Sequence, residues 1–451
     1  MLWDQTTAPA GRYVVLYRGR GEIRYFGGAA EHVVERSPGR DVLDWNPGRD
    51  GAGLGLGIVR TDPADPIRDI RVLLPGGVCS SDQTRWCDAS NPCSEGECRG
   101  FEASHEAQIF NPKFLAQLGR YGLVRFMNWQ GTNASQARTW EERKRVSDAR
   151  WSEGDGVPLE IVAELANRIG VDAWICIPHR ADDRYVVEAG RLMHRLLAPE
   201  RRVWLEYSNE SWNSIFESWR YTRDEGLRLG LGGPEQDHTF AQIRFQARRS
   251  VEVFRKFSEG FPDRARVTRV LASHAPNDWI SDQMLSWSGT ASETDALAIA
   301  PYFGVLVNPS NRAEFLARDA DETMRLAASE LVPEAIGWMR AQKAVASRHH
   351  VELVAYEAGQ HYVGVSGLEH DAELNRRLDA LDRHPAWESV YTSYLDGWKS
   401  AGGGMMAHFL HCARPDGHGR FGLKHWLDEP DARSPRLRAV DAFIARTPRW
   451  W

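Results

Sequence analysis

The sequence contains no uninterrupted apolar run of about 18 residues, the length that a membrane-spanning helix requires, so we expect no membrane segment. It has no excess of positive charge either: 56 Lys and Arg residues against 62 Asp and Glu residues give a net charge of −6. Nucleic acids and anionic lipids, which bind basic surfaces, are therefore not expected as partners. The first eleven residues carry neither a basic cluster nor an apolar core, so no secretory signal is visible in them.

Cysteine is scarce outside one short segment. Four of the six cysteines lie close together in a stretch rich in Ser, Asp, Asn and Gly: Cys79, Cys87, Cys93 and Cys98. Such a stretch cannot bury a core of its own, so we predict two disulfides, with all three pairings open and zinc binding as the alternative. Disulfides imply a secreted or periplasmic location, with any signal upstream of this chain or already removed. Cys176 and Cys412 lie in apolar strand-like segments and are expected to be buried thiols.

The chain changes character near residue 105. Residues 12–76 alternate between apolar and polar side chains with a period of two, interrupted by Gly, Pro and Asp, which predicts a small antiparallel β-sandwich. We therefore divide the chain into an accessory module at 1–77, a disulfide-rich loop at 78–104 and a large domain at 105–451.

In the large domain, short apolar strands and amphipathic helices alternate strictly. The predicted strands cover residues 123–129, 171–178, 202–210, 266–274, 297–303, 351–359 and 404–410. This alternation is typical of parallel βαβ units, and none of the strands is followed by the glycine-rich turn of a dinucleotide-binding fold. We predict an α/β fold, a (β/α)8 TIM barrel. Because such a barrel has eight strands, the first is either residues 69–76 or lies upstream of Met1.

Two of these strands carry a glutamate at or near their C-terminal end. Catalytic residues of TIM barrels lie at the C-terminal ends of the strands, which is where Glu210 and Glu357 are expected. A carboxylate near a barrel interior is costly unless it has a role, and two facing carboxyl groups can cleave a glycosidic bond. The alternative is that each glutamate belongs to a structural salt bridge.

Local motifs add a resemblance to a known group of enzymes. YSNESWN at 207–213 and VAYEAG at 354–359 resemble the fourth- and seventh-strand motifs of the clan of (β/α)8 retaining glycoside hydrolases with two catalytic glutamates. Arg125 is similar to the clan's second-strand arginine, which keeps the nucleophile ionised, Tyr302 to a sixth-strand tyrosine and His179 to a third-strand histidine. The resemblance implies that the first glutamate is the acid/base and the second the nucleophile. The wider pattern, with PHRADDRYV at 178–186 after the third strand and a β-sandwich ahead of the barrel, resembles uncharacterised secreted bacterial proteins that are often labelled cellulose-binding.

The chain departs from the clan at two places. Ser211 follows the Asn-Glu pair where the cellulase branch has proline, and the segment AHFLH stands where the eighth strand usually carries a tryptophan, so His408, Phe409 or Trp426 would replace it. The expected substrate-binding residues are Asn209, Arg125, His179, Tyr302, Trp129, Asn128, Trp212 and His408.

Together these observations predict a retaining glycoside hydrolase that cleaves a β-linked poly- or oligosaccharide without a cofactor or a metal. Two alternatives remain open. One is a non-catalytic carbohydrate-binding protein on a barrel scaffold. The other is a metal-dependent barrel hydrolase that would use His361, His408 and His411. The sugar, the linkage and the oligomeric state cannot be predicted from the sequence.

Overall fold

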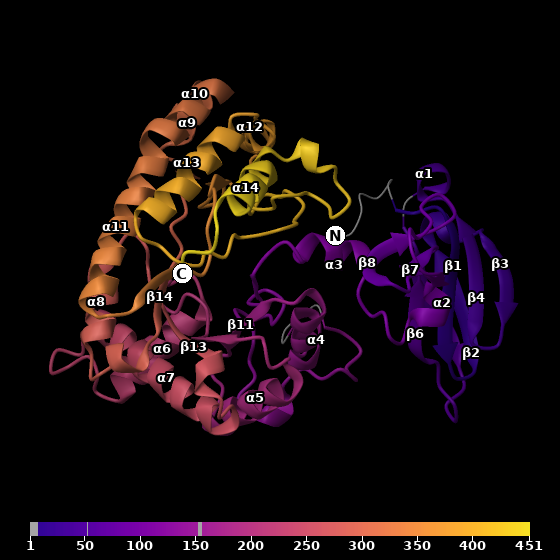
Figure 1. The fold of residues 1–451 in the computed structure, drawn as a ribbon, viewed down its shortest axis with the longest axis horizontal. Coiled ribbons are helices and arrows are strands. Elements are labelled where there is room, and N and C mark those ends of the chain that lie inside the picture. The colour runs from indigo at the N-terminus through magenta and orange to yellow at the C-terminus, as the bar shows by residue number, and fades with distance from the viewer. Residues whose placement is uncertain (1–7, 52, 152–155) are drawn as a thin grey trace. The chain divides into compact units, whose positions relative to one another are not determined.

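The structure is a computed structural model that describes residues 8–51, 53–151 and 156–451. Of the first eleven residues, in which no signal was visible, residues 1–7 therefore lie outside the described part of the chain. Contacts divide the protein into two compact units (Figure 1): residues 1–120 with 425–430, and residues 121–424 with 431–451. The division into an accessory module, a disulfide-rich loop and a large domain, with boundaries after residues 77 and 104, stays a prediction.

The first unit begins with two antiparallel sheets. The larger sheet has the strand order β3-β4-β1-β6, and the smaller pairs β2 with β5. The bounds are β1 (Gly11–Arg18), β2 (Gly21–Phe26), β3 (Val33–Ser37), β4 (Arg40–Trp45), α1 (Pro47–Asp50), β5 (Gly55–Thr61) and β6 (Arg68–Leu73). Alternate residues of β2, Ile23 and Tyr25, are buried and share one core with Val15 and Leu43 of the larger sheet. The predicted antiparallel sheets are therefore confirmed, and the shared core makes them a sandwich.

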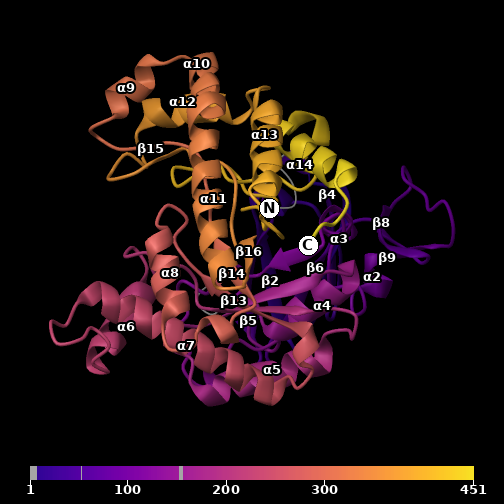
Figure 2. The same cartoon turned by 60° about the vertical axis from the view of Figure 1, so that its left-hand side comes forward.

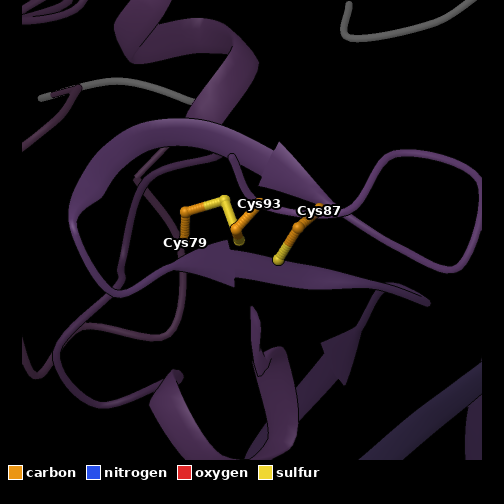
Figure 3. Close-up of side chains that lie close together, drawn as sticks. All are labelled: Cys79, Cys87 and Cys93. Carbon is orange, nitrogen blue, oxygen red and sulfur yellow. A yellow bond between two sulfur atoms is a disulfide. The ribbon is translucent and has the colours of Figure 1, made fainter. Parts of the chain in front are cut away.

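The cysteine-rich segment forms a sheet of its own, where only a loop was predicted. Strands β7 (Gly77–Cys79), β8 (Asp82–Cys87) and β9 (Cys98–Gly100) pair antiparallel in the order β8-β7-β9, followed by α2 (Phe101–Ser104) and α3 (Pro112–Leu118). Two disulfides join Cys79 to Cys93 and Cys87 to Cys98, as Figure 3 shows for the first pair with Cys87 beside it. The disulfide prediction is confirmed and the zinc alternative is wrong. The sulfur atoms of Cys79, Cys87 and Cys93 lie within 4.8 Å of one another because the two bridges are neighbours.

The second unit is built on a parallel sheet with the order β10-β11-β12-β13-β14-β16. Its strands are β10 (Leu123–Arg125), β11 (Asp172–Ile177), β12 (Val203–Tyr207), β13 (Val267–Ala272), β14 (Ala296–Ile299) and β16 (Glu352–Ala355). Met406 continues the sheet through a parallel bridge to Ala355. A strand was predicted at 404–410, and the structure has this single bridge in its place. A short pair, β15 (Leu306–Val307) with β17 (Val363–Gly364), lies outside the main sheet.

The parallel sheet is curled. In a flat sheet, strands β10 and β16 would lie about 24 Å apart, five intervals of about 4.8 Å. Yet Arg125 at the end of β10 donates a hydrogen bond of 2.8 Å to Glu357, two residues beyond β16. Inward-facing residues from all these strands form one interior cluster that includes Trp174, Val270 and Met405. The predicted α/β fold class, a parallel sheet of the TIM-barrel type, is confirmed.

The helices of the second unit are α4 (Leu159–Ile169), α5 (Asp183–Leu196), α6 (Glu217–Arg228), α7 (His238–Gly260), α8 (Asp278–Ser286), α9 (Arg312–Ala317), α10 (Ala320–Leu326), α11 (Val332–Arg348), α12 (Ala372–Asp382), α13 (Trp387–Ser400) and α14 (Pro435–Arg446). Of these, α4, α7 and α11 pack directly against strands of the parallel sheet, whereas α9 and α10 lie away from it (Figures 1 and 2). Within the described ranges, none of the helices has both the length and the apolar character of a bilayer crossing.

The structure corrects one proposal for the first barrel strand. Residues 69–76 do not join the parallel sheet, because β6 pairs antiparallel with β1, with Leu73 opposite Val14. Ile70 and Leu73 of β6 are half-buried and its other residues are exposed, whereas the strands of a parallel sheet are covered on both faces. Cys412 is also more exposed than predicted, whereas Cys176 is fully buried.

Candidate active site

One arginine organises the carboxyl ends of the parallel strands. Arg125 is the last residue of β10, and its side chain is only 5% exposed. It donates from Nη1 to Glu357 (2.8 Å), from Nε and Nη2 to Glu206 (3.0 and 2.8 Å) and from Nη2 to Asn209 (2.8 Å). Residues from β10, β12 and the end of β16 therefore meet at a single guanidinium.

Glu357 is held by two donors on opposite oxygens. Arg125 donates to Oε1, and the hydroxyl of Tyr302, three residues beyond β14, donates to Oε2 at 2.8 Å. The residue is 7% exposed. Burial raises the pKa of Glu357, and both the charge of Arg125 and the Tyr302 hydrogen bond act in the opposite direction. A carboxylate with these two donors is favoured in its ionised form.

Glu210 lies in a different environment, three residues beyond β12. Its carboxyl group accepts hydrogen bonds from the hydroxyl of Tyr356 (2.9 Å) and from Nδ2 of Asn213 (2.8 Å), two neutral groups. Burial, and secondly the negative charge of Glu357, raise the pKa of Glu210 to about 7. Glu210 is the acceptor in both hydrogen bonds. A proton carried by its carboxyl group therefore takes part in neither bond.

The backbone around Glu210 is strained. Glu210 and Ser208 have φ angles of 41° and 58°, in the left-handed region that non-glycine residues rarely adopt. Such conformations cost about 1–3 kcal/mol each and persist where the surrounding structure holds them, often at functional sites. Between them, Asn209 is 1% exposed, accepts from Arg125 and donates to Oδ1 of Asn133 at 2.9 Å. The turn that carries the Asn-Glu pair is thus anchored on both sides.

Glu206 is one of the site residues that the sequence analysis missed. Tyr356 and Asn213, which donate to Glu210, are two others. Glu206 is completely buried on β12 and accepts hydrogen bonds from Arg125, from Nε1 of Trp174 (2.8 Å) and from the thiol of Cys176 (3.5 Å). Burial raises the pKa of Glu206, and the contacts with Arg125 oppose this. A signal was present in the sequence. Glu206 lies two residues after Trp204 on β12, so both side chains point to the same face of this otherwise apolar strand, the face toward the interior.

The remaining predicted binding residues have contacts of their own. His179 is 1% exposed, lies edge-on to Tyr221 at 5.3 Å, and burial lowers its pKa to about 4. Trp212, two residues after Glu210, stacks on His274 with 4.3 Å between the ring centroids.

Trp129 packs against Phe126, while Asn128 is exposed. Burial lowers the pKa of His408 to about 3, and its Nε2 lies 3.3 Å from the hydroxyl of Tyr391. Sugar binding by Asn128, Trp129, His179, Trp212 and His408 remains a prediction.

The three histidines of the metal-dependent alternative contact aromatic side chains. His361 lies against Tyr302 and Phe421, and Nδ1 of His411 is 2.9 Å from the hydroxyl of Tyr121. In the part of the chain that the structure describes, the group of three possible metal ligands within reach of one ion is the disulfide-bonded cysteine cluster. Nothing in these contacts favours a metal centre beside the glutamates.

No family model and no curated protein matches this chain. Solved structures do. A 4-O-α-L-rhamnosyl-β-D-glucuronidase from Fusarium oxysporum 12S is 8% identical with a TM-score of 0.41, and the match covers 71% of this chain and 60% of that one. A Bacteroidetes-affiliated GH5 cellulase is 9% identical with a TM-score of 0.40, covering 83% and 92%.

A GH5-4 broad-specificity endoglucanase from Clostridium acetobutylicum is 8% identical with a TM-score of 0.39, covering 81% of this chain and 96% of that one. The chain is thus structurally similar, at low sequence identity, to glycoside hydrolases of family 5. At this distance the likeness says nothing about the activity of this chain, which has to be argued from its own residues.

Proposed function

We propose that this chain is a retaining glycoside hydrolase that cleaves β-linked poly- or oligosaccharides. One observation carries the proposal: two buried glutamates in one cluster have opposite environments. Glu357 faces an arginine and a tyrosine hydroxyl, whereas Glu210 faces neutral donors and has its pKa raised to about 7. Enzymes that cleave glycosidic bonds need one protonated and one ionised carboxyl group.

In the first step, the ionised Glu357 attacks the anomeric carbon and forms a covalent glycosyl–enzyme ester. Glu210 gives its proton to the glycosidic oxygen as the bond to the leaving sugar breaks. In the second step, Glu210, now ionised, takes a proton from water, and the water oxygen attacks the anomeric carbon. The ester to Glu357 breaks, and the sugar leaves with its original anomeric configuration.

Arg125 and Tyr302 support this cycle through Glu357. Their hydrogen bonds stabilise the carboxylate before attack and again when it is released from the ester. Direct attack requires a short distance between the two carboxyl groups, which for a retaining pair is about 5–5.5 Å. We also propose that the chain works outside the cytoplasm, because its two disulfides persist in an oxidising compartment.

The proposal is tested by reducing-sugar release from a panel of glucans, xylans, mannans and arabinans. We expect hydrolysis of at least one β-linked polymer by the wild type, and a loss of at least a thousandfold in the Glu357→Gln variant, which removes the nucleophile. Glu334→Gln, an exposed position on α11, is the matched control and should keep full activity. Binding to a polymer without any hydrolysis would instead support the non-catalytic carbohydrate-binding alternative.

A further inference from the structure

Glu206 has no role in the two-step cycle, yet it accepts more hydrogen bonds from Arg125 than Glu357 does. Nε and Nη2 of Arg125 both donate to Glu206, and only Nη1 donates to Glu357. We infer that Glu206 is a positioning residue. By sharing Arg125 with Glu357, it fixes where the guanidinium lies and how much positive charge reaches the two catalytic glutamates. The inference rests on the proposed function.

The position of the guanidinium is fixed from several sides. The ring centroids of Trp174 and Tyr356 lie 5.5 and 4.9 Å from Cζ of Arg125, a distance at which a cation is attracted to an aromatic face. Glu206 binds the edge of the guanidinium, and Nε1 of Trp174 holds Glu206 in turn at 2.8 Å. Since Glu206 is fully buried, water cannot replace its carboxylate if that group is lost.

The charges at the site are unbalanced because one cation faces three carboxyl groups. The titratable groups that face this cluster are Arg125, Cys176, Glu206, Glu210, Tyr302, Tyr356 and Glu357. Burial raises the pKa of the Cys176 thiol and of both tyrosines, so these three remain neutral. With Glu206 and Glu357 ionised, Arg125 is already neutralised and one negative charge is left over. A third anion is then unfavourable, so the proton stays on Glu210.

The test replaces Glu206 by glutamine, which keeps the shape of the side chain and removes its charge. Titration of the glutamate carboxyl carbons by ¹³C NMR, without substrate, should show both steps of the Glu210–Glu357 pair moving to lower pH by about one pH unit. Asp382→Asn is the matched control, because Asp382 forms an equally buried ion pair of 2.6 Å with Arg436. This control should destabilise the protein and leave the titration of the pair unchanged.

A second variant separates charge from position. Glu206→Asp keeps the charge but draws the carboxylate back, so the titration should stay within about 0.3 pH unit of the wild type while kcat falls roughly tenfold to a hundredfold. Unchanged titration in Glu206→Gln, or an unchanged kcat in Glu206→Asp, would contradict the inference. If neither variant folds while Asp382→Asn does, Glu206 is only structural and the inference is wrong. Because the titration needs no turnover, it can succeed or fail independently of the hydrolysis panel.

Discussion

Replacing Glu210 by glutamine should stabilise the protein at alkaline pH. The pKa of Glu210 is raised from 4.5 to about 7 in the folded protein, mainly by burial. The folded state therefore holds this proton more tightly than the unfolded chain does. Stability from this proton is fully present below pH 4.5 and is lost as the pH rises to about 7, where an unfavourable buried anion remains.

The size of the effect follows from the two pKa values. Each pKa unit is worth 1.36 kcal/mol, so the rise from 4.5 to about 7 corresponds to about 3 kcal/mol at pH 8. Glutamine is neutral at every pH and does not have this penalty. Its Nε2 would, however, face Nδ2 of Asn213 instead of accepting from it, a loss of about 1 kcal/mol. We expect Glu210→Gln to be about 2 kcal/mol more stable than the wild type at pH 8 and about 1 kcal/mol less stable at pH 4.

Equilibrium urea unfolding at pH 4 and pH 8, followed by tryptophan fluorescence, measures both differences. The exposed Glu334→Gln variant controls for the general effect of removing a carboxylate and should follow the wild type at both pH values. A stability difference between Glu210→Gln and the wild type that is the same at pH 4 and pH 8 would refute the reasoning, because Glu210 would then titrate normally.

Three further predictions concern the cysteines and the catalytic pair. Titration of free thiols in the denatured, unreduced protein should find two, Cys176 and Cys412, and six would exclude the disulfides. Glu210→Gln should lose far more activity on substrates with poor leaving groups than on activated aryl glycosides, which need no acid; equal losses would remove Glu210 from the acid/base role. A crystal structure should place the carboxyl groups of Glu210 and Glu357 about 5–5.5 Å apart, and a separation near 9 Å would mean an inverting mechanism.

The fold could be predicted where apolar spacing is strong. The buried run at 171–178 is β11 (Asp172–Ile177), within one residue at each end. The segment at 69–76 was ambiguous because a short apolar strand fits either kind of sheet, and its partner is set by tertiary contacts. The pairing of the four clustered cysteines could not be derived for the same reason, since spacing alone allows three patterns.

The roles of the site residues stay predictions, but the structure brings three of the named residues together. Glu357 was named because it lies near the end of a predicted strand, and Arg125 and Tyr302 because they resemble residues of the clan; both donate hydrogen bonds to Glu357. Glu206 was not predicted because it lies inside β12. The only signal for it there is that its side chain points to the inward face of the strand. The stacking of Trp212 on His274 depends on the conformations of the loops that carry them, and no sequence pattern specifies these conformations.

The stereochemistry of the first product tests the central claim most directly. The substrate found with the polysaccharide panel is hydrolysed in an NMR tube, and the anomeric proton of the newly formed reducing end is followed from the first turnovers. Double displacement through Glu357 predicts that the β-anomer appears first and that the α-anomer grows in only by mutarotation. An α-anomer that appears first would contradict the assignment of Glu357 as the nucleophile.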